Sequence, residues 1–464
     1  MKKKTLGILI TLFLPTMLLA QEGIAKNEIA YKKTQLNHKI LVVGHRGYPG
    51  IMPEETRPSY ESAATNGADY LELDLHMTKD CQLIARHNPW MKDNTNVEQV
   101  AKTNPEVAKR IRTTPGRFVT IKWQREDKDH GPDKYLTDLV DPKDYKSRLK
   151  ALVVDGEDHT NDWSVSDFTL KELKDWIGGT SFDAAADRPS SLNGKFPILT
   201  FQEVIDIAKE ETKRTGRTIG IYPESKNPIW NNGQAIANGC GALGSHPFED
   251  SILKVIEKNG LNSKESPIIV QSFDPQSLKC LRSKGLKTKV IQLMDGNDVD
   301  YYTGKVIYNT NNYLTFVSGR PYSWTVAGKP DYFGSMLAPA GLNEVATYAD
   351  IIGPWKMEIM TFLNTKKQGA RNDINLVDLV RPNQVIADAH KLGLSVHPFT
   401  FRNEKQYLAG VYHNQPINEY LDFYEAGVDG VFTDYTGTAI DARSIFEGSI
   451  KLNSSMDTSG LNKL

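Results

Sequence analysis

Three carboxylates at the ends of β-rich runs form a candidate metal site. In residues 70–76, leucines alternate with polar residues, so Glu72 and Asp74 share one face of the predicted strand, ~6.6 Å apart along it. Two carboxylates buried on one face repel each other and lose hydration unless a cation lies between them. Glu224 ends a second apolar run. The set predicts an oxygen-preferring cation such as Mg²⁺ or Ca²⁺. A solvated strand face, and a surface salt bridge between Glu224 and Lys226, are the alternatives.

A histidine and two cations accompany these carboxylates. Gly44-His45-Arg46-Gly47 directly follows the run 40–44, and Lys226 follows Glu224 by two residues. An arginine can hold a phosphate through two parallel hydrogen bonds, and a histidine can act as acid or base near neutral pH. The glycines let the backbone turn sharply and approach a ligand. These residues predict a phosphate-binding site, although a lone histidine is more often structural.

A second histidine is placed by a register argument. Residues 79–82 are predicted to form a tight turn between the run 70–75 and the run 82–86. If the loop consists of Asp80 and Cys81 alone, paired residue numbers sum to 161 and Asp74 lies opposite His87. A slip of one residue would turn His87 to the other face.

Short β-rich runs alternate with amphipathic stretches along most of the chain. The predicted strands are residues 40–44, 70–75, 82–86, 218–223, 268–272, 290–293, 349–353, 394–398 and 430–433. The predicted helices include residues 201–214, 247–259, 275–284, 382–392 and 417–426. This alternation predicts an α/β fold with a parallel sheet, most simply a TIM (β/α)8 barrel. Polar residues at strand ends, where such barrels hold their chemistry, are His45, Glu224, Gln271, His397 and Asp434.

Two regions interrupt the alternation. Residues 94–161 are long and lysine-rich, and they are predicted to be an insertion within the barrel, beside the active-site face. Residues 301–342, rich in Tyr, Asn and Gly, are predicted to be a long loop. The barrel itself is assigned to residues 40–445 and a C-terminal tail to residues 446–464.

Composition restricts the class of protein. The chain has 464 residues and a formal net charge of -1, which argues against a nucleic-acid binder that relies on a global basic field. Residues 1–20 have a basic start and a short apolar run, typical of a secretory signal peptide, so we expect an exported, periplasmic or secreted protein without a stable membrane anchor. An uncleaved anchor is the alternative. The three cysteines allow at most one intramolecular disulfide, and unpaired buried thiols are the expectation.

Taken together, the motifs resemble the glycerophosphodiester phosphodiesterase family, and most closely its periplasmic bacterial branch. The similarity runs in family order from residue 40 to about 445. The matching stretches are Gly44-His45-Arg46-Gly47, Pro53-Glu54-Glu55-Thr56, residues 67–74 and 77–80, His87, residues 221–226, Gln271-Ser272-Phe273, residues 396–402 and residues 429–434.

The resemblance implies an imperfect TIM barrel that hydrolyses glycerophosphodiesters to sn-glycerol 3-phosphate and an alcohol. It implies a small-molecule substrate and one divalent cation, for which the periplasmic branch favours Ca²⁺ over Mg²⁺. The residues that it assigns are Glu72, Asp74 and Glu224 to the cation, His45 and His87 to acid–base catalysis, and Arg46, Lys226 and Gln271 to substrate binding.

The sequence departs from the family motifs at two positions, and two other functions are alternatives to the one that the resemblance implies. Asn88 stands where the family usually has Asp after the second histidine, and Cys81 replaces the glycine of the turn. A phospholipase-type lyase that stops at a cyclic phosphate is one alternative, although no apolar or basic helix suited to a bilayer is evident. An exported binding or adhesion protein on the same scaffold is the other, and it predicts damaged catalytic residues, whereas all five implied ones are present.

Overall fold

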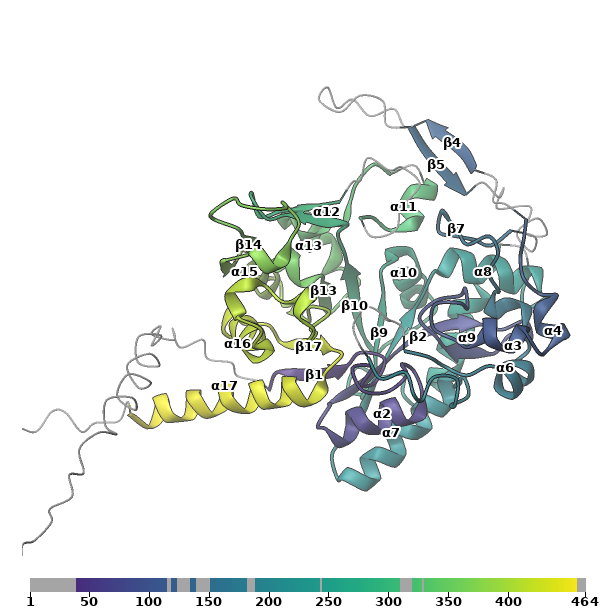
Figure 1. The fold of residues 1–464 in the computed structure, drawn as a ribbon, viewed down its shortest axis with the longest axis horizontal. Helices are drawn as coiled ribbons and strands as arrows, with labels where there is room; N and C mark the ends of the chain where they lie inside the picture. The colour runs from purple at the N-terminus through teal and green to yellow at the C-terminus, as the bar shows by residue number, and fades with distance from the viewer. Residues whose placement is uncertain are drawn as a thin grey trace, which may run out of the picture.

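Eight parallel strands form a nearly closed barrel in the computed structural model, in the order β16-β13-β10-β9-β8-β2-β1-β17 (Figure 1). The strands are β1 (Leu41–Gly44), β2 (Tyr70–Met77), β8 (Gly220–Ser225), β9 (Ile269–Ser272), β10 (Lys289–Met294), β13 (Ile351–Pro354), β16 (Ser395–Val396) and β17 (Gly430–Thr433). The seam between β16 and β17 is bridged by backbone hydrogen bonds, from Asp429 N to Val396 O and from Phe401 N to Phe432 O, both 2.9 Å. The predicted (β/α)8 barrel is confirmed.

The structure describes residues 39–114, 118–122, 134–138, 151–181, 188–242, 244–308, 319–327 and 329–456. The predicted signal peptide, residues 1–20, lies outside them. All nine predicted strands occur, eight in the barrel and the ninth as β3 (Leu83–Ala85), which pairs antiparallel with β2.

Helices cover the outside of the barrel where the sequence provides start signals and apolar faces. They include α2 (Arg57–Thr65), α7 (Phe201–Thr215), α8 (Pro228–Ala237), α9 (Pro247–Lys258), α10 (Pro275–Ser283), α13 (Pro339–Val345), α15 (Val385–Lys391), α16 (Pro416–Ala426) and α17 (Thr436–Met456). Six of these begin with Pro at one of the first two positions, where no intrahelical N–H bond is lost. Among the described residues, every helix falls short of the length and apolarity that crossing a bilayer requires.

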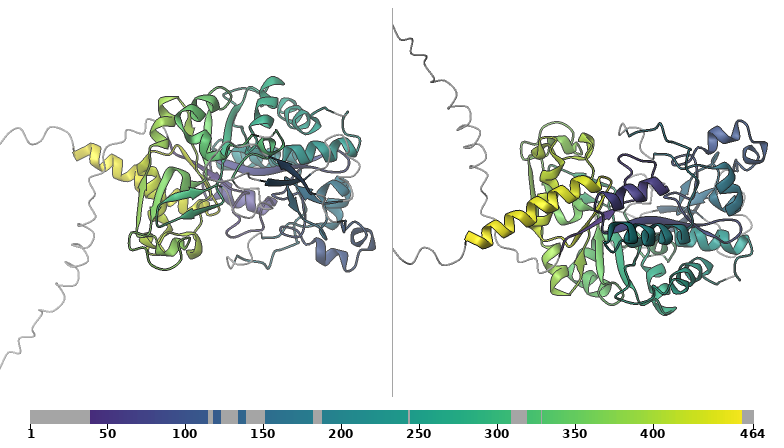
Figure 2. Two further views of the ribbon diagram at one scale, coloured as in Figure 1. Left: turned by 90° about the horizontal axis from the view of Figure 1, so that it is seen from above. Right: turned by 90° about the horizontal axis from the view of Figure 1, so that it is seen from below.

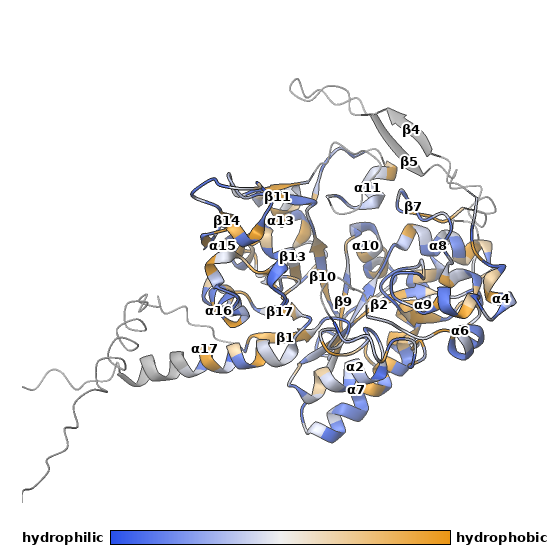
Figure 3. Ribbon diagram, in the orientation of Figure 1, coloured by the Kyte–Doolittle hydropathy of each residue, from blue (hydrophilic) through white to orange (hydrophobic). Residues whose placement is uncertain are grey.

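Helix α7 shows how the local sequence sets these boundaries. The Thr200 side chain accepts a hydrogen bond from the Glu203 amide, and the Glu203 carboxylate accepts one from the Thr200 amide, which forms a capping box. The helix ends at Gly216, whose φ of 68° is the left-handed cap conformation. Apolar residues of α7, among them Phe201 and Val204, are buried, while hydrophilic residues alternate with them along the helix (Figure 3).

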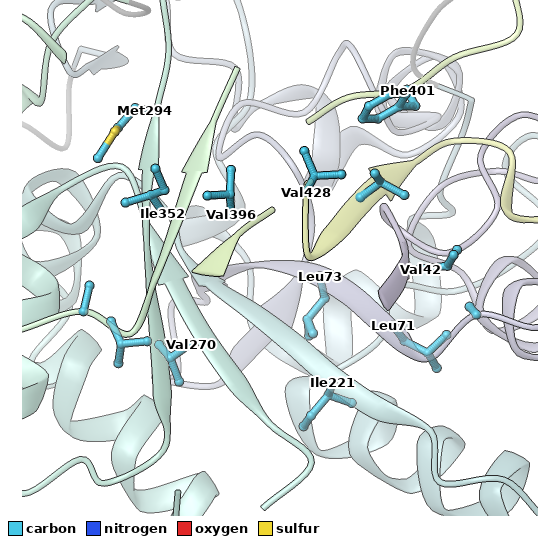
Figure 4. Packing of buried hydrophobic residues seen from close by; sticks show 14 of the residues in the cluster. Val42, Leu71, Leu73, Ile221, Val270, Met294, Ile352, Val396, Phe401 and Val428 are labelled. Atoms are coloured by element: carbon cyan, nitrogen blue, oxygen red, sulfur yellow. The ribbon is translucent and has the colours of Figure 1, made fainter. Parts of the chain in front are cut away.

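Two apolar layers lie on opposite faces of the sheet. Leu71, Leu73 and Ile221 project to one side of β2 and β8 (Figure 4) and join a large cluster that includes helix residues. A smaller cluster, which contains Val43, Tyr222 and other strand residues but no helix residue, fills the barrel interior. Because side chains alternate along a strand, Glu72 and Asp74 share the inner face, as the leucine alternation predicts.

The segment between β3 and α7 adds structure on one side of the barrel. It includes α3 (Val97–Ala101), α4 (Pro105–Ala108), α6 (Leu170–Trp176), the ribbon β4 (Phe118–Lys122) and β5 (Lys134–Asp138), and the ribbon β6 (Val153–Val154) and β7 (Glu157–Asp158). A separate apolar cluster, which includes Met91, Val107 and Phe168, holds its helices together. The predicted insertion, residues 94–161, falls within this segment, and part of it lies outside the described residues.

The described parts of residues 301–342 are not the plain loop that was expected. The first of them follow β11 (Asp298–Asp300), which pairs with β12 (Lys305–Ile307), and the later ones form α11 (Tyr322–Ala327), α12 (Phe333–Leu337) and the start of α13. At the C-terminus, the proposed tail boundary at residue 446 falls inside α17, which packs on α16 and extends away from the barrel (Figure 2).

The hairpin that leads to His87 has a different register from the predicted one. Leu75 pairs with Ala85, so paired numbers sum to 160, and Asp74 O accepts a bond from Arg86 N. The turn contains one residue more than predicted, because Cys81 adopts a left-handed φ of 66°. A left-handed third residue is typical of three-residue hairpin loops. The predicted pairing of Asp74 with His87 is therefore wrong.

The prediction of unpaired thiols is wrong for two of the three cysteines. Cys81, in the β2–β3 turn, forms a disulfide with Cys240, just after α8, across a sequence separation of 159. Cys280 has a free, half-buried thiol. The disulfide joins the two strand–helix units that carry Glu72, Asp74 and Glu224.

Candidate active site

The three predicted metal-binding carboxylates meet at the carboxyl ends of β2 and β8. The parallel register places Asp74 directly beside Glu224, and Glu72 lies two residues earlier on the same inner face. One oxygen from each carboxylate lies within 4.8 Å of the others, and all three residues are buried. Three hard oxygen donors at this spacing fit the ligand chemistry of a divalent cation such as Ca²⁺ or Mg²⁺.

The electrostatics of this cluster also fit a cation. Burial, together with the charge on Asp74, raises the pKa of Glu72 well above its usual range. Burial raises the pKa of Glu224 to about 8, against the opposing effect of Lys226. Burial would also raise the pKa of Asp74, but Lys226 and Arg46 lower it to about 2. Protein groups alone therefore leave two of the three carboxylates with a tendency to hold a proton, which a bound divalent cation would displace.

Two cations border the carboxylates. Nζ of Lys226 lies 3.5 Å from an oxygen of Asp74 and 3.5 Å from one of Glu224. Nε of Arg46 lies 3.4 Å from Asp74, and its Nη1 donates to Glu54 at 3.1 Å. The predicted alternative, a surface salt bridge between Lys226 and Glu224, is wrong in its location: the ion pair forms, but the Lys226 side chain is only 15% exposed and lines the cavity.

The loop after β1 is folded by its glycines. A Cβ on Gly44 would lie 2.6 Å from Gly47 O and 2.9 Å from Ala63 Cβ, and Gly47 has a φ of 92°. Arg46 itself adopts a φ of 54°, which is uncommon for a residue with a Cβ. In this conformation the Arg46 amide donates to Glu72 at 2.6 Å, so the loop positions both a carboxylate and a guanidinium.

His45 is paired with a buried aspartate. Its Nδ1 lies 2.6 Å from Oδ1 of Asp434, and the other oxygen of Asp434 accepts from Arg188 at 2.6 Å and from Arg402 at 2.8 Å. Burial would raise the pKa of Asp434, but Arg402, Arg188 and His45 hold it well below its usual range. An ionised Asp434 keeps the proton of neutral His45 on Nδ1 and leaves Nε2 able to accept one. Burial and the charge of Arg46 lower the pKa of His45.

His87 reaches the cavity although the predicted register does not hold. Strand β3 ends at Ala85, so the alternation of the hairpin does not extend to His87, which lines the same cavity as His45. Burial, Arg46 and Lys226 lower the pKa of His87 well below its usual value.

Asn88, the departure from the family pattern, also lines this cavity. Its amide donates to Asp93 at 3.2 Å, so a carboxylate is present near this position after all, five residues further along the chain.

Gln271 is brought to the site, where it contacts a carboxylate. The β8–β9 register places it beside Glu224, and its amide donates to Glu72 at 3.0 Å and to Tyr222 O at 3.3 Å. Gln271 therefore orients Glu72 while it lines the cavity; a contact with substrate stays a prediction.

All eight predicted site residues line one cavity of about 610 Å³ at the carboxyl ends of the strands. Its walls also include aromatic residues from the segments that follow β9, β11, β13 and β16, among them Phe273, Tyr301, Trp355 and Phe399. Asp155 and Trp90, from the segment between β3 and α7, complete the rim. His397 lies elsewhere: it is buried, and its Nδ1 is 3.0 Å from Tyr222 OH.

Several supporting residues were not assigned a role from the sequence. Glu55 accepts a bond from the Asp74 amide at 2.8 Å and one from Arg86 at 3.4 Å, so it fixes the strand that carries the carboxylates. Burial raises the pKa of Glu55 to about 8. The signal was present in Pro53-Glu54-Glu55-Thr56, an acidic pair before a helix, but its partners are distant in sequence.

The strand ends of this parallel barrel bring acidic, basic and histidine side chains into one cavity. Such a combination is suited to the hydrolysis of phosphodiesters. The carboxylates can hold a metal ion, the side chains of Arg46 and Lys226 can neutralise phosphate oxygens, and the histidines can transfer protons.

Comparison with known proteins gives the family. Residues 45–438 match the glycerophosphoryl diester phosphodiesterase family. Glycerophosphodiester phosphodiesterase GDPD6 of Arabidopsis thaliana is 29% identical over 419 residues, which cover 88% of this chain and 87% of that protein. A glycerophosphodiester phosphodiesterase of Haemophilus influenzae is 26% identical over 459 residues, covering 95% and 98%. The chain belongs to the glycerophosphoryl diester phosphodiesterase family and is an enzyme of that class.

Among solved structures, a phosphodiesterase of Oleispira antarctica in complex with the product sn-glycerol-3-phosphate is similar, with a TM-score of 0.45 and 12% sequence identity. The match covers 87% of this chain and 96% of that one.

Proposed function

We propose that the protein hydrolyses glycerophosphodiesters to sn-glycerol 3-phosphate and an alcohol, with one divalent cation held by Glu72, Asp74 and Glu224. The observation that carries the proposal is the convergence of these three buried carboxylates with both histidines in one cavity. When bound, the cation would supply positive charge to the phosphate oxygens. The family and the two curated relatives support the reaction.

The cationic side chains neutralise the phosphate. Nζ of Lys226 lies 3.5 Å from one carboxylate oxygen of Asp74, and Nε of Arg46 lies 3.4 Å from the other. A phosphodiester that enters the cavity therefore meets two positive groups at the same end, where they can hold its non-bridging oxygens and the charge that grows on them.

The histidines transfer the protons. Cleavage needs a base for the attacking hydroxyl and an acid for the leaving alkoxide. Burial lowers the pKa of both His45 and His87 and so favours their basic form. One histidine, neutral, takes the proton of the attacking hydroxyl, and the other, in its imidazolium form, gives a proton to the alkoxide. Nε2 of His45 exchanges the proton, because Asp434 occupies Nδ1. In this proposal, Asp434 orients His45, and the arginines Arg188 and Arg402 keep Asp434 ionised.

The test is release of glycerol 3-phosphate from glycerophosphocholine by the purified protein, compared with His45→Ala and His87→Ala. Each variant is expected to lose at least about 100-fold in kcat, because a positioned acid or base contributes about 10²–10⁴-fold. A folded His45→Ala variant with wild-type kcat would contradict the assignment of His45.

We further propose that the protein is exported and that its cation is Ca²⁺ rather than Mg²⁺. The basic and apolar residues 1–20 support export. The Cys81–Cys240 disulfide supports it independently, because disulfides persist mainly in oxidising compartments, where Ca²⁺ is also accessible. Export is tested by expression of the full chain in a bacterium with two membranes, followed by fractionation and N-terminal mass spectrometry. A cytoplasmic protein that keeps residues 1–20 would contradict it.

A further inference from the structure

The cavity has a second end, which is lined by a carboxylate and aromatic rings, whereas Lys226 and Arg46 line the phosphate-binding end. Asp295 directly follows β10, and Trp355 directly follows β13. The register of these strands pairs Met294 with Pro354, so Asp295 and Trp355 are the next neighbours. Trp355 pairs in turn with Phe399. Three consecutive segments of the barrel therefore place a carboxylate and two aromatic rings side by side at one level.

Phe273 connects the two ends. Its ring lies edge-on to Phe399, with centroids 5.6 Å apart, and Nζ of Lys226 lies 5.7 Å from its centre. The four residues Phe273, Asp295, Trp355 and Phe399 all line the cavity and are half-buried, so that each keeps a surface turned to it. A ligand whose phosphate lies near Lys226 would extend along Phe273 toward this end.

Asp295, like Glu72 and Asp274, is a carboxylate of the cavity that has no ion-pair partner among the described residues. The Asp295 carboxylate accepts a hydrogen bond from the next amide, Gly296 N, at 2.8 Å. Burial raises the pKa of Asp295 to about 7, and Lys226 opposes this rise only in part. A carboxylate in this position is incompletely compensated, and a cation beside it would favour its charged form.

The surrounding rings suit the same kind of ligand. Aromatic faces attract alkylated ammonium groups, and they do so most strongly where water is partly excluded. Gly296 brings the backbone against the tryptophan: a Cβ there would lie 3.3 Å from the Trp355 ring. The carboxylate and the indole are thus held together by the chain rather than by a flexible contact.

We propose that Asp295, Trp355, Phe399 and Phe273 form a subsite for a cationic leaving alcohol, of the choline or ethanolamine type, so that the enzyme prefers glycerophosphodiesters with a positively charged head group. The inference rests on the proposed function and specifies its substrate. The glycerol part is neutral and common to all substrates, so it has no need of an uncompensated carboxylate. Four covalent bonds separate phosphorus from nitrogen in a choline ester, so the ammonium group of a substrate whose phosphate lies at Lys226 can reach Phe273, whose ring centre is 5.7 Å from Nζ of Lys226.

The test compares two esters of glycerophosphate that share a shape and differ in charge: the choline ester and the 3,3-dimethylbutyl ester, in which carbon replaces the nitrogen. The wild type is expected to prefer the choline ester in kcat/KM by about tenfold. Asp295→Asn keeps the size of the side chain and removes its charge, and it is expected to reduce this ratio to about two to three, because the aromatic rings remain. Trp355→Leu is expected to reduce it in part.

Asp298→Asn is the matched control, because Asp298 lies three residues further along, in β11, and is not among the cavity residues. It should keep the preference for the choline ester. Equal kcat/KM for the two esters in the wild type, or an undiminished preference in Asp295→Asn, would overturn this inference alone. Absence of hydrolysis of either ester by the wild type would overturn the proposed function, and this inference with it.

Discussion

Removal of the Cys81–Cys240 disulfide is expected to destabilise the fold strongly. The bond closes a loop with a sequence separation of 159. Loop-closure entropy for that length corresponds to about 5 kcal/mol, and measured losses for native disulfides are generally about 2–5 kcal/mol. Since domains of ordinary stability unfold at a cost of about 5–15 kcal/mol, the double variant Cys81→Ala/Cys240→Ala should lose a large share of its free energy of unfolding.

Equilibrium unfolding in urea, followed by circular dichroism, measures this loss. The double variant should unfold at a clearly lower urea concentration than the wild type, and a reductant should lower the wild-type midpoint without affecting the variant. Cys280→Ala is the matched control, because this half-buried thiol forms no disulfide. Coincident unfolding midpoints of the wild type and the double variant, without reductant, would refute the reasoning.

Three further predictions follow from single contacts. Asp434→Asn should lower kcat about 100-fold with little change in KM, because the amide no longer fixes the proton of His45 on Nδ1; steady-state kinetics with an unchanged kcat would contradict this. Lys226→Met should lower kcat/KM by about 10–100-fold through loss of a charged phosphate contact, and Lys226→Arg should restore part of it, whereas equal losses in both would argue against a charge effect. The hydrogen bond to Asp429 raises the pKa of His390, so this contact stabilises the fold below the unfolded pKa of histidine and is lost as the pH rises through the folded value. Because His390 is 40% exposed, His390→Gln should cost only about 0.5 kcal/mol more at pH 5.5 than at pH 8 in urea unfolding, and an equal cost at both would exclude the ion pair.

The barrel and the carboxylate cluster were predictable because both depend on local patterns and one topological rule. Strict alternation in β2 places Glu72 and Asp74 on a single face whichever neighbours the strand has. Carboxyl ends of parallel strands meet at one end of a barrel, so Glu224, 150 residues later, arrives beside Asp74. The alternation of apolar and polar residues and the ends of the β-rich runs can both be read from the sequence, and together they predict which carboxylates meet.

Other features depended on distant partners. Asp434 pairs with His45 across 389 residues, and no local pattern identifies that contact. Closure of the barrel, which places β17 beside β1 with Gly44 paired to Thr433, is the signal that could have found it. The predicted hairpin register was wrong because the register depends on the left-handed backbone conformation of Cys81. A glycine would have indicated that conformation, but a cysteine does not.

The central claim is that one divalent cation, bound by Glu72, Asp74 and Glu224, is required for hydrolysis. The most direct measurement uses the purified protein stripped of metal, titrated with Ca²⁺ and in parallel with Mg²⁺, with bound metal and release of glycerol 3-phosphate from glycerophosphocholine recorded on the same samples. The account predicts one bound cation per chain, activity that rises in proportion to its occupancy, and loss of both in Glu72→Ala. Full activity of the metal-free protein, or wild-type metal binding and turnover in Glu72→Ala, would contradict it.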